Sequence, residues 1–186
     1  MEDIINKIKD GEVVVLPTDT LYGLHASVFD KEAIAKIYNL KKRTTTKPLI
    51  ILISSWEDLD KLSINVTSSV KEKLEIWWPS SLSVILPCEN PELEYLHRGT
   101  NSLAIRWPDY SLLNNILKEV GPLVSTTVNV EGGKIAYNII EAKEMFGDRV
   151  DGYLDDGERS GAHSTLIKVA GGNIEILRKG AIDIEL

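Results

Sequence analysis

Four groups of polar side chains follow apolar runs, and they carry the chemistry that this chain can offer. The hydroxyl groups of Thr18 and Thr20 follow the run 13–16, and the guanidinium of Arg106 follows the run 103–105. Further hydroxyl and amide groups stand at Ser125, Thr127, Asn129, Ser164 and Thr165. Ligand sites in open α/β sheets lie at the strand ends, so we expect these groups to converge. Such a set suits phosphates and a small carboxylate, and it contains no acid/base dyad.

A cluster of cations lies in the segment 41–47. Lys41, Lys42, Arg43 and Lys47 form the densest positive cluster of a chain whose net charge is −7, with 21 basic and 28 acidic side chains. An acidic protein with one short basic cluster is a poor match for a nucleic-acid groove but suits one polyphosphate. The alternative is that these cations only complement the dipole at the end of a helix.

The residues favour catalysis by positioning and by neutralisation of charge. Phosphoryl and adenylyl transfer need little covalent participation from the protein, because cations and oriented donors stabilise the charge on the phosphate. Neither a P-loop nor a dinucleotide fingerprint occurs in the sequence. The alternative for the hydroxyl groups is that they are ordinary strand residues with satisfied hydrogen bonds.

The elements that must position these groups follow from periodicity and from cap and turn residues. We expect a short helix at 3–10 and, with Asp30 as its N-cap, a second helix at 31–40. A hydroxyl-rich loop should occupy 17–24, an acidic loop 89–94, and a hairpin turn Ala170 to Asn173. The other expected helices are 66–77, 112–117 and 138–146, and the expected strands are 13–16, 49–53, 84–86, 103–105, 123–125, 152–154, 164–169 and 174–178. This pattern predicts one α/β domain over 1–186, built on a mixed sheet.

Composition excludes several classes of protein. The 186 residues are 43% hydrophobic and 26% charged, as in ordinary globular proteins. We find neither a long apolar stretch nor a signal peptide, so we expect a cytoplasmic location and no membrane partner. Cys88 is the only cysteine, which excludes an internal disulfide and a cysteine zinc cluster. The three histidines lack metal-ligand spacing, and we assign no metal to protein side chains.

Seven segments, in order along nearly the whole chain, resemble the YrdC/TsaC family of threonylcarbamoyl-AMP synthases. These segments are 17–24, 41–43, 47–49, 103–109, 121–123 with 127–129, 164–165 and 176–182. The resemblance implies a twisted mixed sheet flanked by helices around a concave cavity, a fold related to that of dihydroxybutanone-phosphate synthase. It also implies a reaction in which L-threonine, bicarbonate or CO2, and ATP with Mg²⁺ give threonylcarbamoyl-AMP and pyrophosphate.

The resemblance further implies partners and residue roles. The product serves modification of adenosine 37 in tRNA through a downstream threonylcarbamoyl transferase complex, and any direct binding of tRNA or other RNA should be weak. Lys41 and Arg43 are the implied catalytic cations. The implied threonine-binding residues are Thr20, Arg106, Ser125 and Ser164. The implied ATP-binding residues are Arg43, Lys47, Ser102, Thr127, Asn129 and Arg178.

The sequence departs from the family pattern at several places. Pro79-Ser80-Ser81 replaces the usual Pro-Gly-Pro, and Leu52 stands where some members have histidine. Thr127-Val128-Asn129 stands for the usual Ser-x-Asn, and Arg178 to Ala181 for Arg-Pro-Gly-Ala. These changes leave open a diverged paralogue that binds nucleotide or RNA without the synthase activity.

Two other activities fit less well. A carbamoyl-transfer module of the hydrogenase-maturation type needs acylphosphatase and zinc-finger domains, and dihydroxybutanone-phosphate synthase needs an acidic metal motif. The sequence shows none of these. Because the chain ends at Leu186, directly after the motif segments, we expect the short, single-domain form.

Overall fold

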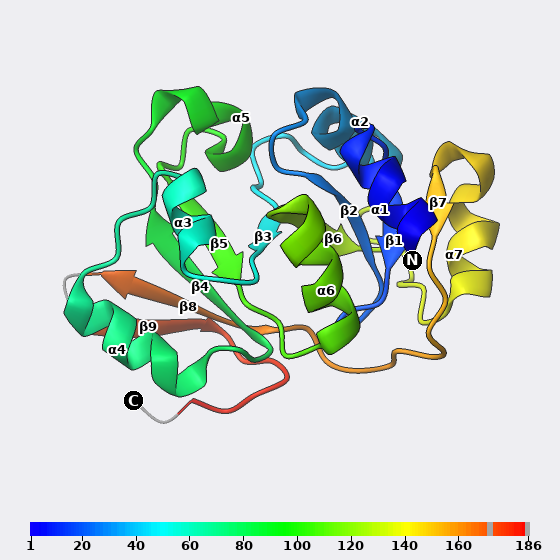
Figure 1. Cartoon of the computed structure of the whole chain (residues 1–186). Helices are drawn as coiled ribbons and strands as arrows, with labels where there is room; N and C mark the ends of the chain where they lie inside the picture. Colours follow the sequence, from blue (N-terminus) through cyan, green and yellow to red (C-terminus); the bar gives the residue numbers. More distant parts are fainter. Residues whose placement is uncertain (171–172, 185–186) are drawn as a thin grey trace.

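A single mixed sheet organises the chain (Figure 1). The computed structural model describes residues 1–170 and 173–184. Within these residues the strand order is β7-β1-β2-β6-β3-β5-β4-β8-β9. The β1–β7, β3–β5 and β4–β8 pairs are parallel, and the other neighbours are antiparallel. The strands are β1 Val14–Leu16, β2 Gly23–Ser27, β3 Ile50–Leu52, β4 Leu82–Pro87, β5 Ser102–Arg106, β6 Leu123–Thr127, β7 Gly152–Tyr153, β8 Thr165–Ala170 and β9 Asn173–Arg178.

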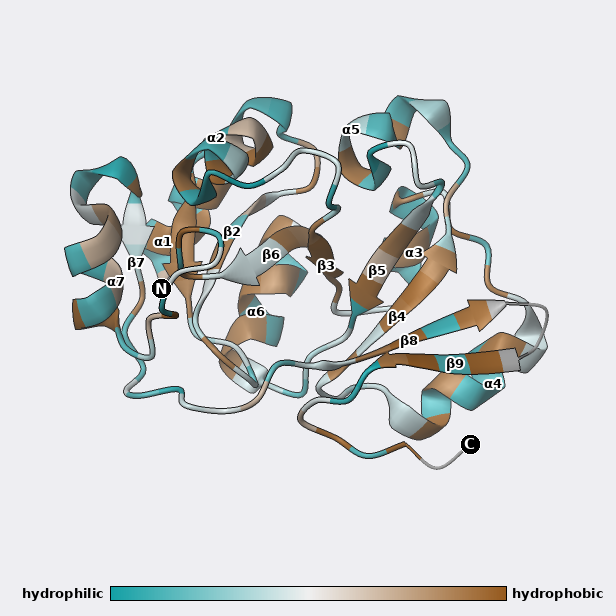
Figure 2. Ribbon diagram, turned by 180° about the vertical axis from the view of Figure 1, so that it is seen from behind, coloured by the Kyte–Doolittle hydropathy of each residue, from teal (hydrophilic) through white to brown (hydrophobic). Residues whose placement is uncertain are grey.

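Helices cover the sheet unevenly. Seen from behind, β5, β4 and β8 present a side that no helix covers (Figure 2). The α-helices are α1 Glu2–Lys9, α2 Lys31–Lys41, α3 Glu57–Lys61, α4 Ser68–Trp77, α5 Glu94–His97, α6 Ser111–Val120 and α7 Ile139–Phe146; short 3₁₀ turns lie at η1 Pro91–Leu93 and η2 Gly147–Arg149.

The two faces of the sheet differ because successive side chains of a strand point to opposite sides. On one face, apolar residues such as Ile51, Ile105 and Val124 form a large core with α2, α3, α4, α5 and α7. On the other face, Leu52 and Leu123 pack with α1 and α6 in a smaller core. The remainder of that second face lines the site described below, with the polar Arg106 and Ser125 among apolar residues such as Ile85 and Ala104.

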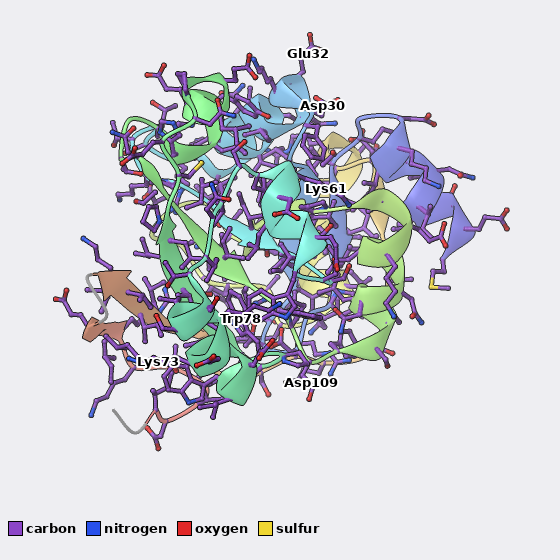
Figure 3. All side chains as sticks on the ribbon, turned by 60° about the vertical axis from the view of Figure 1, so that its left-hand side comes forward. Asp30, Glu32, Lys61, Lys73, Trp78 and Asp109 are labelled. Atoms are coloured by element: carbon purple, nitrogen blue, oxygen red, sulfur yellow. The ribbon has the colours of Figure 1, made fainter. Side chains whose placement is uncertain are left out.

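Local signals explain where the main elements begin. Asp30, labelled in Figure 3 at the start of α2, accepts a hydrogen bond from the amide of Ala33 at 2.8 Å, as an N-cap should. The indole of Trp78, at the end of α4, donates to the carbonyl of Leu82 at 3.0 Å and so fixes the turn into β4. Trp78 is buried in the large core.

The predicted mixed α/β sheet is confirmed, with two local corrections. Gly23 and Leu24 are not loop residues: they begin β2, which was missed because its alternating Gly23, His25 and Ser27 face the polar side. The expected acidic loop contains η1 and begins α5, because Asn90 caps a turn there. The antiparallel pairing of β8 and β9 matches the expected hairpin, although Gly171 and Gly172 lie outside the described residues.

Two further observations concern the chain as a whole. Cys88 is buried, and burial raises the pKa of its thiol, as expected for a structural cysteine. In the described part of the chain, no helix is long and apolar enough to cross a membrane.

Candidate functional site

A cavity of about 490 Å³ lies on the second face of the sheet, beside the part that α1 and α6 cover. It brings together most of the residues that the sequence singled out. Eight of the eleven expected site residues line it: Thr20, Arg43, Ser102, Arg106, Ser125, Thr127, Ser164 and Arg178. Arg106, Ser125 and Thr127 lie on the same face of the sheet, on β5 and β6, with β3 between these two strands. Lys41, Lys47 and Asn129 do not line the cavity.

Arg106 forms the buried cationic end of the cavity. Its residue is only 4% exposed, and its Nη1 donates to Oγ1 of Thr20 at 3.2 Å. Its Nη2 lies 3.4 Å from Oδ1 of Asp19, which supplies the opposite charge. Its Nε has no hydrogen-bond partner among the described residues. A planar guanidinium with a free donor in a cavity is suited to binding a carboxylate.

The loop after β1 presents Thr20 because Thr18 closes a tight turn. The hydroxyl of Thr18 accepts hydrogen bonds from the amides of Thr20 and Leu21 at 3.0 and 3.2 Å. The same hydroxyl donates to the carbonyl of Leu21 at 2.7 Å. Hydroxyl side chains that bond to nearby backbone groups stabilise turns in this way. The turn therefore sets the position of the Thr20 side chain.

A buried histidine supports Ser125. Nε2 of His25 lies 3.1 Å from Oγ of Ser125 across the paired strands β2 and β6. Burial first, and the nearby charge of Arg106 second, lower the pKa of His25 to about 3, so the imidazole is neutral at pH 7. Gly23 makes room for the ring, because a Cβ there would lie 2.6 Å from Cε1 of His25.

We expect His25 to make stability depend on pH. The unfolded histidine binds a proton below its ordinary pKa of 6.5, whereas the folded one does not until about pH 3. The unfolded state therefore holds more protons in this window, and the free energy of unfolding should fall as pH falls. In urea unfolding experiments between pH 7 and 4, the free energy of unfolding should fall with falling pH more steeply than it does in His25→Gln. The difference in slope should be up to about 1.4 kcal/mol per pH unit. Parallel curves for the two proteins would contradict this expectation.

The C-terminal motif fixes Ser164. Nε and Nη2 of Arg178 donate to the carbonyl of Ser164 at 3.1 and 2.9 Å, and Nη2 lies 3.2 Å from its hydroxyl. The hydroxyl of Ser83 lies 2.8 Å from that of Ser164. Gly180 permits this close packing, because a Cβ there would lie 2.3 Å from the carbonyl oxygen of His163. Arg178 is therefore partly engaged by the protein while it lines the cavity.

Another part of the cavity wall carries one cation from the basic segment. Arg43 lines the cavity, and its side chain donates to the carbonyls of Lys47 and Pro48 at 3.4 and 3.3 Å. Ser102 and Thr127 add hydroxyl groups to the same wall. These donors could meet the oxygens of a phosphate chain.

Lys41 does not reach the cavity, contrary to the expected contact with a triphosphate. It is 1% exposed, and its Nζ donates to the carbonyl of Thr127 and to the carbonyl and Oδ1 of Asn129, the last two at 2.9 and 2.7 Å. Burial, with the nearby charge of Arg43, lowers the pKa of Lys41 to about 8. The last turn of α2 is packed against the end of β6, so this ammonium holds the backbone after β6.

Two other expected residues are held away from the cavity. Nζ of Lys47 forms a 2.7 Å ion pair with Oε1 of Glu131. The amide of Asn129 donates to the carbonyls of Val130 and Gly133, so its side chain shapes the loop after β6. Leu52 lies beside Arg106 in the β3–β5 register but is fully buried in the smaller core. Leu52 is therefore not one of the residues that line the cavity.

Sequence reasoning missed several residues of the site. A second layer lies behind the residues that line the cavity, and it consists of Asp19, Ser81, Ser83 and His25. His163 lines the cavity beside Ser164. Asp19 could have been found, because it stands between Thr18 and Thr20 in the same loop. The contacts of Ser81 and Ser83 left no local signal, because their partners are distant in the sequence.

Comparison with known proteins points to one family. The family model described as telomere recombination (Sua5/YciO/YrdC) matches residues 6–180. A relative from Mycobacterium tuberculosis is 31% identical over 183 residues, which cover 97% of this chain and 84% of the relative. A Bacillus subtilis protein named threonylcarbamoyl-AMP synthase is 31% identical over 181 residues, or 96% of this chain and 52% of the relative.

A solved structure supports the same relationship. Pyrococcus abyssi Sua5 complexed with L-threonine matches with a TM-score of 0.87 and 27% identity. The match covers 96% of this chain and 53% of that one. This chain thus spans about half the length of the Bacillus and Pyrococcus proteins.

Proposed function

This chain belongs to the Sua5/YciO/YrdC family, and on that premise we propose that it is an L-threonylcarbamoyladenylate synthase. Its substrates are L-threonine, bicarbonate or CO2, and ATP, and its products are threonylcarbamoyl-AMP and pyrophosphate. One observation carries the proposal: a single cavity joins the buried guanidinium of Arg106 to a second set of phosphate-binding donors around Arg43. A small carboxylate and a nucleotide can bind there side by side.

The threonine subsite is formed around Arg106. The guanidinium binds the carboxylate of threonine, and the hydroxyls of Thr20, Ser125 and Ser164 orient the rest of the molecule. A similar protein has been solved in complex with L-threonine, which supports threonine as the amino-acid substrate. The ATP subsite uses Arg43, Ser102, Thr127 and Arg178 directly, whereas Lys47 and Asn129 act from outside the lining.

The reaction follows from this placement. The free amine of threonine attacks the carbon of CO2 and loses a proton, which gives a carbamate. A carbamate oxygen then attacks the α-phosphorus of ATP, and the bond from that phosphorus to the bridging oxygen breaks, so that pyrophosphate leaves. Arg43 offsets negative charge on the phosphates, and Arg106 holds the nucleophile in line; both effects are positioning and charge stabilisation.

We propose that magnesium binds without a site made from protein side chains alone. The cavity lining contains no carboxylate, and the described residues include no cluster of three acidic, histidine or cysteine side chains that could hold a metal. Mg²⁺ commonly binds through substrate phosphates and water with few protein ligands. We propose that it enters as the ATP complex, and we assign it no protein ligand.

A pyrophosphate-release assay tests the proposed function. The purified protein is incubated with ATP, Mg²⁺ and bicarbonate, with L-threonine, with L-serine as the control, or with no amino acid. We expect release that depends on threonine. Failure of release while ATP still binds would contradict the synthase and would favour a nucleotide-binding paralogue.

We propose that Arg43 is the cation of the basic segment that binds ATP directly. Arg43→Ala should raise KM for ATP about tenfold to a hundredfold, because it removes charged hydrogen bonds to phosphate. KM for threonine should stay unchanged. Lys47→Ala is the comparison, and its effect should be smaller because Glu131 already pairs with Lys47. Equal effects of the two variants in steady-state kinetics would contradict this reading.

Transfer to tRNA belongs to a later step. We propose that the product passes to a threonylcarbamoyl transferase complex and that the enzyme itself contacts tRNA or other RNA only weakly. The net charge of −7 supports weak, salt-sensitive binding. Filter binding in rising salt tests this, and tight binding that ignores salt would oppose it. We propose a cytoplasmic location, where the tRNA substrate of this modification is found.

A further inference from the structure

Ser81 contacts the threonine subsite from behind. It lies in the turn between α4 and β4, at the second serine of Pro79-Ser80-Ser81. Its hydroxyl donates to Oδ2 of Asp19 at 2.6 Å.

The hydrogen bond matters because Asp19 is a buried carboxylate. The side chains of Asp19 and Arg106 are 6% and 5% exposed. Oδ1 of Asp19 has no hydrogen-bond partner and only the 3.4 Å charge contact with Arg106. Within the described residues, Ser81 therefore gives this carboxylate its one hydrogen bond. A buried charge without hydrogen bonds costs free energy. Without the hydroxyl of Ser81, the carboxylate of Asp19 should therefore shift toward another donor.

Backbone contacts hold Ser81 in place independently of its side chain. The amide of Ser80 donates to the carbonyl of Trp107 at 2.8 Å, which ties the turn to the end of β5 beside Arg106. The amide of Thr165 donates to the carbonyl of Ser81 at 3.0 Å. Removal of the hydroxyl should therefore leave the turn in position and free only Asp19.

We propose that Ser81 is a positioning residue of the amino-acid subsite: its hydroxyl orients Asp19, and Asp19 holds the guanidinium of Arg106 where the substrate carboxylate binds. Nη1 of Arg106 is held by Thr20 and Nη2 faces Asp19, so these two contacts set the direction of the fork. Bidentate recognition of a carboxylate depends on that direction. The inference rests on the proposed function, because the carboxylate in question is that of threonine.

Ser81→Ala tests the proposal by separating the two substrates. We expect KM for threonine to rise about tenfold, the effect of one hydrogen bond to a charged group, while KM for ATP stays unchanged. Calorimetric titration with L-threonine alone should show the same loss of affinity. Ser81→Thr keeps the donor and should restore most of the affinity.

The matched control is the neighbouring serine. Ser80→Ala removes a hydroxyl from the same turn, but no described residue forms a hydrogen bond with this oxygen. Its KM for threonine should equal that of the unmodified protein. If Ser81→Ala fails to fold, Ser81→Cys replaces it, because a thiol of similar size is only a weak donor.

The outcomes separate the inference from the proposed function. A rise in KM for threonine in Ser81→Ala alone supports the inference. Unchanged threonine affinity, or an equal change for ATP, overturns it while the synthase stands. If the unmodified protein neither releases pyrophosphate with threonine nor binds threonine, both proposals fail. If it binds threonine without turnover, the synthase fails, and titration of Ser81→Ala still decides the inference.

Discussion

Arg106→Lys is expected to lower kcat/KM for threonine by about a hundredfold to a thousandfold. Lysine keeps the positive charge beside Asp19, but one ammonium cannot bond Thr20, face Asp19 and bind a carboxylate through two parallel donors. Two charged hydrogen bonds contribute roughly 1.5–3 kcal/mol each, and 1.4 kcal/mol corresponds to a factor of ten. Steady-state pyrophosphate release at saturating ATP measures the effect.

The same variant should leave the nucleotide end intact. Affinity for ATP in the absence of threonine should be unchanged, because Arg43 and Thr127 lie at the other end of the cavity. Arg149→Lys is a control, since Arg149 lies outside the cavity lining and bonds to Phe146. An unchanged kcat/KM for threonine in Arg106→Lys would remove Arg106 from carboxylate recognition.

Lys41→Met should lower the free energy of unfolding by about 2–4 kcal/mol. Methionine fills a similar volume, but it leaves the carbonyls of Thr127 and Asn129 and Oδ1 of Asn129 without the ammonium. The loss of three charged hydrogen bonds is offset only partly by removal of a buried charge. Urea unfolding at pH 7, below the pKa of about 8, measures the change in the charged state.

The expected effect of Lys41→Met on activity follows from the same contacts. Thr127 lines the cavity, so a displaced backbone after β6 should raise KM for ATP. Lys42→Met is the matched control, because Lys42 is the next residue and is exposed. Equal free energies of unfolding for the two variants would contradict a structural role of Lys41. A loss of turnover without a loss of stability would instead return Lys41 to direct contact with the phosphates.

Much of the site could be predicted because its residues sit at strand ends. Hydrophobic periodicity identified β3, β5 and β6. Because alternate side chains of a strand face the same side of the sheet, it also placed Arg106, Ser125 and Thr127 on one face. Polar residues on one face of otherwise apolar strands form a local pattern that can be recognised from the sequence alone. β2 escaped this reasoning because its polar face and its glycine hide the strand pattern.

Burial of charged groups could not be predicted in the same way. Lys41 was assigned to the triphosphate because it stands beside Arg43, yet one of these neighbours is enclosed and the other lines the cavity. Lys41 is the last residue of α2, and Lys42 takes a left-handed conformation with φ of 51°, so the chain changes direction before Arg43. Which of the two side chains becomes buried depends on the elements that pack against the end of α2.

By itself, the sequence determined the α/β class, the mixed sheet, the family segments and eight of the residues that line the cavity. These properties depend on residue types and short spacings, which act locally. Only the tertiary structure decided that Ser81 meets Asp19, that Ser83 meets Ser164 and that His25 supports Ser125. Each of these contacts joins residues more than sixty positions apart, and such a contact exists only after the strands have paired.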